Sequence, residues 1–117
     1  MSLNQDKYDT LMTFLRQLSL NVSVNELSLQ ELKENIRILQ QFFQEQIVPL
    51  DSDEWYERSY RTEISKQLRL LDVDILFLQG AKQPATVESR LKAISDRISI
   101  LISYCQAVLD GKSENES

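Results

Sequence analysis

The most prominent hydrophobic pattern in the chain runs from Asp53 to Gln79, directly before Gly80. The apolar and aromatic side chains that repeat within it are Tyr56, Tyr60, Ile64, Leu68, Leu71, Ile75 and Leu78. Steps of three and four residues keep these side chains on one side of a helix, which is typical of an amphipathic helix packed against others. At ~1.5 Å per residue such a helix would be roughly 40 Å long and could project past its neighbours.

The second half of this helix carries apolar side chains on more than one face. Eight of the eleven residues before Gln79 are apolar. Leu70, Val73 and Phe77 fall opposite the main stripe, and Trp55 lies on the same line near the start of the helix. One interpretation is that the protein wraps this helix widely and buries Leu70 and Phe77. The other is that the four side chains form an exposed patch for a partner or for self-association, with the spacing used in helix-in-groove recognition.

A first helix is predicted from about Gln5 to Leu20. Its apolar stripe again steps by three and four and consists of Tyr8, Leu11, Leu15 and Leu18. Met12 and Phe14 widen the stripe. The polar and partly β-branched stretch NVSVNE that follows is a weak place to continue a helix.

The second helix has the clearest start signal. Ser28 and Glu31 form a capping box, in which each side chain satisfies the free backbone N–H of the other, and Leu27 and Leu32 occupy the positions of a hydrophobic staple. The inner stripe that follows is Leu32, Ile36, Leu39, Phe43 and Ile47, flanked by Ile38 and Phe42. Pro49 ends the helix, because the residue before a proline is pushed out of helical geometry.

The ends of the two remaining helices are also marked by residue type. Asp51 or Ser52 is expected to cap the third helix, and Gly80 to end it in a left-handed conformation. Pro84 and Thr86 fit the start of a fourth helix. Its stripe alternates steps of four and three over three heptads: Val87, Leu91, Ile94, Ile98, Leu101, Cys105 and Val108. This repeat favours shallow packing against antiparallel neighbours.

These elements predict an all-α protein, an antiparallel up-and-down four-helix bundle. Two glycines and two prolines in 117 residues leave little room for many short elements. Residues 1–110 are expected to form a single helical bundle domain, and residues 111–117 a disordered acidic tail. The alternative is a long helical hairpin that completes its core only on dimerising.

Charge and composition narrow the class of partner and the compartment. The net charge of −5 and pI of about 4.7 disfavour nucleic acid, since phosphate binding calls for a basic face. The start MSLNQDKYDT has neither a basic nor an apolar signal segment, and no run approaches the roughly 20 apolar residues of a membrane span. A single cysteine, Cys105, suits a reducing compartment, so we expect a cytoplasmic protein.

The residues that most enzymes need are scarce. The chain has no histidine, which excludes Ser-His and Cys-His sites and the Glu-x-x-His metal sites of helical bundles. Cys105 occupies a core heptad position and is interpreted as a small buried hydrophobic residue. Asp51 and Asp53 lack the glycine and distal glutamate of a calcium loop. Asp72 and Asp74 point apart on a helix and are interpreted as interruptions that keep an apolar run soluble. No catalytic residue, metal ligand or cofactor is predicted.

One enzymatic alternative remains, a small all-helical enzyme of the chorismate mutase type, which holds its substrate with arginines inside a bundle. The cations of the third helix are Arg58, Arg61, Lys66 and Arg69. Each has an acidic residue at helical reach: Glu54 for Arg58, Glu57 for Arg61, Glu63 for Lys66 and Asp72 for Arg69. Such pairs favour a solvated, self-neutralised face over an anion pocket.

A further feature of the third helix is the run WYERSYRTEISKQLRLLDVDILFLQGAKQP. Together with the size, acidity and four-helix pattern of the chain, this run resembles the PatD proteins, a family of small heterocyst-frequency control proteins of filamentous cyanobacteria. The resemblance implies a non-enzymatic cytoplasmic regulator that limits cell differentiation and interacts with the cell-division protein FtsZ. It carries no contact residues over to this chain.

The sequence therefore favours a regulatory protein–protein interaction module with no cofactor. The candidate partner-binding residues are Trp55, Leu70, Val73 and Phe77. The alternatives are the small helical enzyme and a purely structural homodimer.

Overall fold

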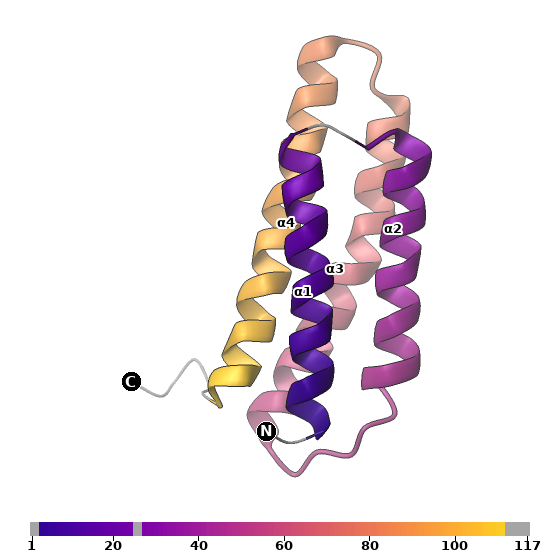
Figure 1. Ribbon diagram of the computed structural model, residues 1–117. Coiled ribbons are helices and arrows are strands. Elements are labelled where there is room, and N and C mark those ends of the chain that lie inside the picture. The colour runs from indigo at the N-terminus through magenta and orange to yellow at the C-terminus, as the bar shows by residue number, and fades with distance from the viewer. Residues whose placement is uncertain (1–2, 25–26, 112–117) are drawn as a thin grey trace.

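The computed structural model describes residues 3–24 and 27–111, and within them it contains helices and no strands (Figure 1). The helices are α1 (Leu3–Ser23), α2 (Leu29–Phe42), the π-helical turn η1 (Phe43–Ile47), α3 (Trp55–Gly80) and α4 (Pro84–Asp110). They run alternately up and down, which confirms the all-α, antiparallel four-helix bundle. Residues 112–117 of the predicted tail lie outside the described residues.

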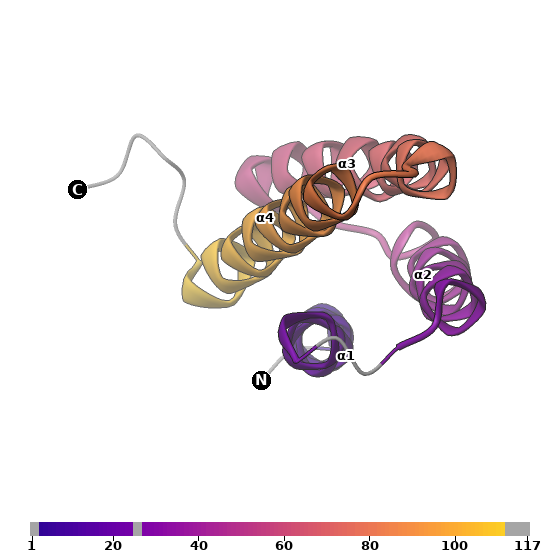
Figure 2. The same ribbon diagram turned by 90° about the horizontal axis from the view of Figure 1, so that it is seen from above.

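Helices that follow one another along the chain also lie side by side (Figure 2). The backbones of α1 and α3 approach α4 over most of its length, whereas α2 approaches α1 and α3 much less extensively. The molecule is elongated, with extents of 47 × 30 × 21 Å. Contact between α2 and the rest therefore depends mainly on its long inner side chains, which leaves room for a groove along its border with α3.

The core is built from the inner stripes that the helical periodicity predicts. Its buried side chains are Tyr8, Leu11, Met12, Leu15, Leu18, Leu32, Ile36, Leu39, Phe43, Ile47, Tyr60, Ile64, Leu68, Leu71, Ile75, Ile94, Ile98, Leu101, Cys105 and Val108, together with Val22. The prediction that Phe14 and Ile38 extend the inner stripes is wrong. Phe14 is exposed and touches Phe42 edge-on, with ring centroids 5.6 Å apart, and Ile38 is also exposed. Phe14 thus meets α2 only at the edge of the bundle, and neither side chain joins the core.

The start of α2 confirms the capping box. The Glu31 N–H donates to Ser28 Oγ and the Ser28 N–H donates to Glu31 Oε1, both at 3.1 Å. Donation from the Ser28 backbone N–H, and to a lesser extent from the Ser28 side chain, holds the pKa of the Glu31 carboxyl below its usual range. Leu27 packs half-buried against the core, as expected of a hydrophobic staple. At the other end, η1 widens the last turn so that Phe43 and Ile47 both stay buried, and the helix ends two residues before Pro49.

The predicted caps of α3 are wrong at both ends. The helix begins at Trp55, and the side chain of its N-cap residue, Glu54, makes no capping hydrogen bond. Ser52 Oγ instead accepts from the Glu54 N–H at 3.2 Å, one residue before the helix, which shapes the turn. Gly80 is the last helical residue, followed by an extended Ala81. No left-handed residue is needed there, since the chain must run extended towards Pro84, a first helical position as predicted.

The hairpin formed by α3 and α4 projects beyond the connection between α1 and α2, as the length of α3 predicts (Figure 1). Its tip has fewer neighbours than the middle of the bundle, and Val87 and Leu91 on α4 are only half-buried there. None of the helices in the described part of the chain is long and apolar enough to cross a membrane.

Candidate docking surface

The candidate partner-binding residues differ in exposure and in position. Val73 is 42%, Phe77 51% and Trp55 53% exposed, whereas Leu70 is half-buried. Wide burial of the helix is therefore wrong for Phe77 and holds only in part for Leu70. Trp55 lies 18 residues before Val73, or ~27 Å along the helix axis, so the structure does not bring it into the same patch.

Leu76 belongs to this patch and was missed from the sequence. It is the most exposed of the large apolar side chains described, at 66%. It lies between the inner stripe and the outward side of α3, so a comparison of opposite faces passes over it. The high apolar content of the second half of the helix was the available signal.

An arginine from α4 covers part of this patch. The guanidinium carbon of Arg90 lies 4.4 Å from the centre of the Phe77 ring. This is a cation–π contact, which fixes the ring against α4 while about half of Phe77 stays in contact with solvent. Phe77 is therefore held in place rather than buried.

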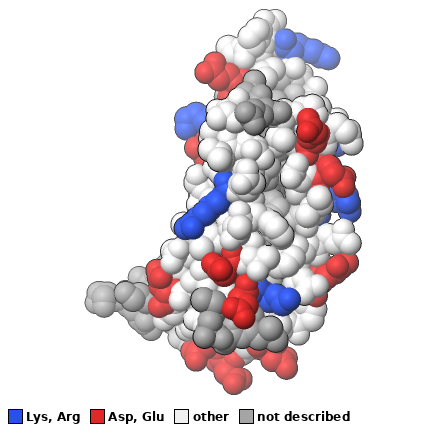
Figure 3. All heavy atoms as spheres, viewed as in Figure 1, with Lys and Arg blue, Asp and Glu red and all other residues white. Residues whose placement is uncertain are grey.

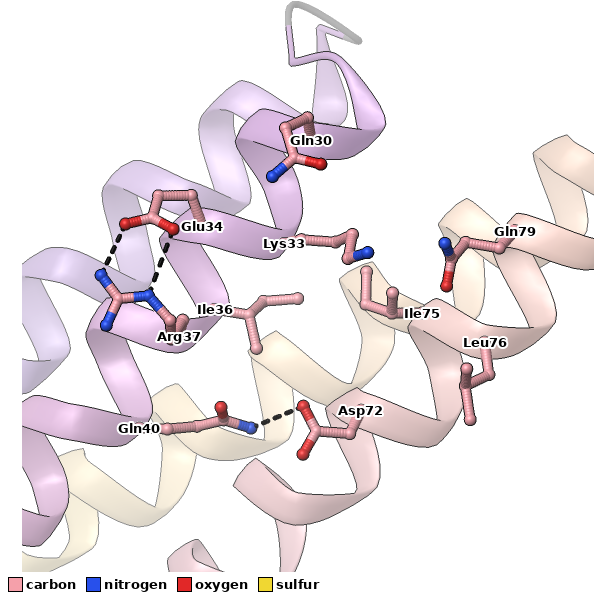
Figure 4. A pocket seen from close by; sticks show the side chains of 10 residues that line it. All are labelled: Gln30, Lys33, Glu34, Ile36, Arg37, Gln40, Asp72, Ile75, Leu76 and Gln79. Carbon is pink, nitrogen blue, oxygen red and sulfur yellow. Dashed lines mark hydrogen bonds and ion pairs between the residues drawn. The ribbon is translucent and has the colours of Figure 1, made fainter.

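A groove of about 440 Å³ lies between α2 and α3, next to Leu76 (Figure 4). Ile36 of α2 and Ile75 of α3 form its apolar floor, and the amino group of Lys33 points across it towards α3. At one end, Gln40 Nε2 donates to Asp72 Oδ1 and to the Leu68 carbonyl, both at 2.9 Å. This size falls in the range of ordinary ligand pockets.

The groove and the patch form one continuous surface because Leu76 borders both. We call this surface, made of Ile36, Val73, Ile75, Leu76 and Phe77, the docking surface. Its members come from α2 and from the second half of α3. It thus combines an apolar floor in a groove with an apolar ridge beside it, an arrangement found where proteins accept a side chain or a short helix.

Behind this surface, a buried ion pair joins α3 to α4. Arg97 Nε donates to Asp74 Oδ2 at 2.6 Å, and Arg97 Nη1 donates to Gln67 Oε1. Asp74 is therefore not an interruption that keeps the apolar run soluble. It is buried and faces α4, because the Arg97 guanidinium, bonded to Asp74 through Nε and Nη2, compensates the loss of water. The pair fixes the turn of α3 that carries Val73 and Phe77.

A second buried network lies at the other end of α3. Asn4 Nδ2 donates to Glu57 Oε1 at 2.8 Å, Arg61 Nη2 donates to Glu57 Oε2 at 3.1 Å, and Arg61 Nη1 donates to the Leu50 carbonyl at 2.7 Å. Arg61 Nε also reaches the hydroxyl of Tyr8, at 3.4 Å. Burial raises the pKa of Tyr8 to about 12, although Arg61 opposes the shift. This network ties α1 and the connection after α2 to α3.

The predicted solvated, self-neutralised face is therefore only partly correct. The Glu57–Arg61 pair forms but is buried. Lys66 and Glu63 pair at 3.0 Å in solvent, as expected. Arg58 bonds the Ser52 carbonyl rather than Glu54, and Asp72 bonds Gln40 rather than Arg69. The four cations of α3 thus act in separate places and do not surround a common site.

The structure also places the one cysteine. Cys105 is fully buried in the core, which confirms its interpretation as a small hydrophobic residue, and burial raises the pKa of its thiol to about 12. A thiol protonated at neutral pH is a poor nucleophile. Among the residues described, no three His, Cys, Asp or Glu side chains are placed to hold a metal ion.

Comparison with known proteins gives a family. Residues 6–104 match the family model of the CRR41 C-terminal domain. The chain belongs to this family. The match covers α2, η1, α3 and most of α1 and α4, so the CRR41 C-terminal domain includes the whole docking surface and the Asp74–Arg97 pair, whereas Asn4 of the second network lies just before it. A search of curated proteins and a search of solved structures each found no match.

Membership of the CRR41 C-terminal domain family names neither an activity nor a partner. It also leaves the resemblance to the heterocyst-control family PatD as a prediction. The functional proposal therefore rests on the docking surface.

Proposed function

We propose that this chain is a non-enzymatic regulatory module that binds another protein at the docking surface. The observation that supports this most is the exposure of three contiguous large apolar side chains, Val73, Leu76 and Phe77, on the second half of α3. Isolated exposed apolar residues are common on any protein, but contiguous ones beside a groove mark interaction surfaces.

The energetics favour an occupant for this surface. Each large apolar side chain taken fully out of water contributes about 1.5–3 kcal/mol, and these three are about half-exposed. A partner that covers them would therefore gain about half of that contribution from each, whereas Ile36 and Ile75 are already buried and only shape the groove. The Asp74–Arg97 pair and the Arg90–Phe77 contact hold the surface in place, which lowers the entropy lost on binding.

The resemblance to the PatD proteins supplies a candidate partner and setting. On that basis we propose a cytoplasmic regulator of heterocyst differentiation that acts through FtsZ. The docking surface gives this proposal a physical contact site, which the resemblance itself does not supply.

The enzymatic alternative finds little support in the geometry. A chorismate-mutase-like site needs cations that converge on one anion. Here Arg61 is bonded within a buried structural network, while Lys66 and Arg69 are exposed on the outward side of α3. The groove contains Arg37, but Glu34 already pairs with it, at 2.6 Å. We therefore keep the interaction module as the proposed function.

The test is a pair of substitutions in the docking surface, Leu76→Asp with Phe77→Asp. Because both side chains are exposed, the variant is expected to keep its helical circular dichroism and melting temperature while losing binding to purified FtsZ. The matched control is Leu20→Asp with Ile38→Asp, which changes two exposed apolar residues elsewhere and should leave binding intact.

Unchanged binding by the surface variant would reject the docking surface as the contact site. Absence of binding by the unmodified protein would reject FtsZ as the partner. A collapsed melting transition in the surface variant would show that Leu76 and Phe77 belong to the core.

A further inference from the structure

The charges around the docking surface differ from those of the chain as a whole. The exposed side chains of α3 from Trp55 to Phe77 are apolar, hydroxyl-bearing or cationic, with Asp72 as the exception: Trp55, Arg58, Ser59, Thr62, Lys66, Arg69, Val73, Leu76 and Phe77. Yet the whole chain has a net charge of −5. The outward side of α3 is thus cationic, whereas the chain as a whole is acidic.

Each carboxylate of α3 is engaged away from this side. Glu57 and Asp74 are buried in ion pairs with Arg61 and Arg97. The remaining two face sideways, since Asp72 accepts from Gln40 of α2 and Glu63 pairs with Lys66. Asp72 nevertheless lines the groove, so a partner at the docking surface meets this one engaged carboxylate beside the cations.

Three cations border the docking surface and form no ion pair with any described residue. Lys33 points into the groove, Arg69 stands one turn before Val73, and Arg90 lies over Phe77. Arg69 is exposed, and Lys33 and Arg90 are half-buried. These three are left without a carboxylate partner among the described residues, around a patch of apolar side chains.

Two carboxylates, Glu34 and Asp72, line the groove, where Arg37 and Gln40 bond them, but much of the acidic excess lies elsewhere. In the view of Figure 3 many of the acidic side chains gather at the lower end, where Figure 1 places the connection between α2 and α3. That connection contains Asp51, Asp53 and Glu54 at the far end of α3 from the docking surface.

The same charges oppose a two-fold dimer through this side of α3. Such a dimer would place the outward side of α3 against the same side of a second copy. Its interface would then contain two copies each of Arg58, Lys66 and Arg69. Only Lys66 of these has a carboxylate partner. Like charges facing one another without water cost several kcal/mol, so the exposed apolar residues are poorly suited to self-association.

From this charge pattern, and resting on the proposed function, we infer that the docking surface receives an acidic amphipathic segment of a partner protein. Apolar side chains of that segment cover Leu76 and Phe77 and enter the groove above Ile36 and Ile75. Its Asp and Glu side chains reach Lys33, Arg69 and Arg90. Charge complementarity then selects the partner, while apolar burial supplies most of the affinity.

Site-specific photo-crosslinking tests the inference on the full chain in its native cell. A benzoylphenylalanine introduced at Phe77 is irradiated, and the captured peptide is identified by mass spectrometry; the same probe at Ile38 is the control. The inference predicts capture of a protein segment rich in Asp and Glu with apolar residues between them. Capture of a basic or uncharged segment, of lipid, of nucleic acid or of a second copy of this chain would overturn it.

A lack of capture above the Ile38 control would instead reject the proposed function, and the inference with it. The captured segment is then made as a synthetic peptide and titrated against two variants with the same change in net charge. Arg69→Glu with Arg90→Glu should weaken binding at least about tenfold. Arg16→Glu with Lys92→Glu, on exposed sites of α1 and α4 away from the docking surface, should change it less than about twofold. Equal effects of the two pairs would contradict a charge-selective surface.

Discussion

At the residue scale, the geometry of the docking surface depends on the buried Asp74–Arg97 ion pair behind it. Asp74 and Arg97 were separate in the sequence, 23 positions apart, and only the packing of α4 on α3 brings them together. Both side chains of the pair are largely shielded from water, so removal of either one leaves the other as an uncompensated buried charge. This makes Arg97 a structural residue even though it is a charged side chain.

We therefore expect Arg97→Ala to lower the free energy of unfolding by about 3 kcal/mol, because it leaves Asp74 buried without a cation. Urea unfolding followed by circular dichroism measures the loss. The double variant Asp74→Leu with Arg97→Met should recover most of it, since an apolar pair needs no compensation. A loss under about 1 kcal/mol in the single variant would mean that water reaches Asp74.

The buried thiol of Cys105 gives a prediction about pH. Its pKa is about 12 in the folded protein against 9.0 for the free group, so the folded state keeps its proton when the unfolded state has lost it. The sign follows: the stability that this group contributes is complete below pH 9 and is lost as pH rises towards 12. At pH 11 the loss attributable to this thiol is about 2–3 kcal/mol.

Urea unfolding at pH 8 and at pH 11 measures this effect, with Cys105→Ala as the comparison. The parent protein should lose more stability between the two values than the variant does, although the variant starts lower because of the cavity it creates. Tyr8, with its pKa raised to about 12 by burial, adds a further loss above pH 10 in both proteins. Equal losses in the two proteins would show that the thiol titrates normally.

At the scale of the helices, the residue periodicity was enough to predict all four, together with their inner faces. That prediction succeeds because burial of one face dominates the energy of each helix. The ends are less predictable. Ser28 and Glu31 were found because the two partners lie three positions apart in one local motif. Ser52 and Gly80 were misjudged, since the path of the connection, which depends on neighbouring helices, decides where a helix stops.

The candidate site was predictable only in part for the same reason. Val73 and Phe77 follow from helical angles on α3 alone. The groove at Ile36 and Ile75, the Arg90–Phe77 contact and the exposure of Leu76 depend on how α2 and α4 lie against α3. Sequence spacing within a single helix carries no information about that placement.

The two glycines test this difference between helix ends. Gly80 is helical and a Cβ added there meets nothing within 4 Å, so Gly80→Ala should stabilise the protein by about 0.5 kcal/mol. Gly111 ends α4 with φ 68°, so Gly111→Ala should destabilise it by about 1 kcal/mol. Thermal melts of both variants measure the changes. The same sign for the two would contradict the assigned conformations.

At the scale of the whole molecule, the bundle separates stability from binding. The middle of the bundle contains the core. At one end, the Asn4–Glu57–Arg61 network ties α1 and the connection after α2 to α3. The tip of the α3–α4 hairpin has fewer neighbours, and just before it Val73, Leu76 and Phe77 of α3 are left exposed beside the groove of α2. A purely structural homodimer through the outward side of α3 is opposed by the cations on that side. The shape and the charges together favour a partner of another sequence.

The most direct measurement of this central claim compares three forms of the chain in one affinity capture from native cells. The forms are the unmodified protein, the surface variant Leu76→Asp with Phe77→Asp, and the control Leu20→Asp with Ile38→Asp. Quantitative mass spectrometry should find one partner enriched equally on the unmodified and control forms and reduced at least about tenfold on the surface variant. A partner retained equally by all three would contradict the docking surface.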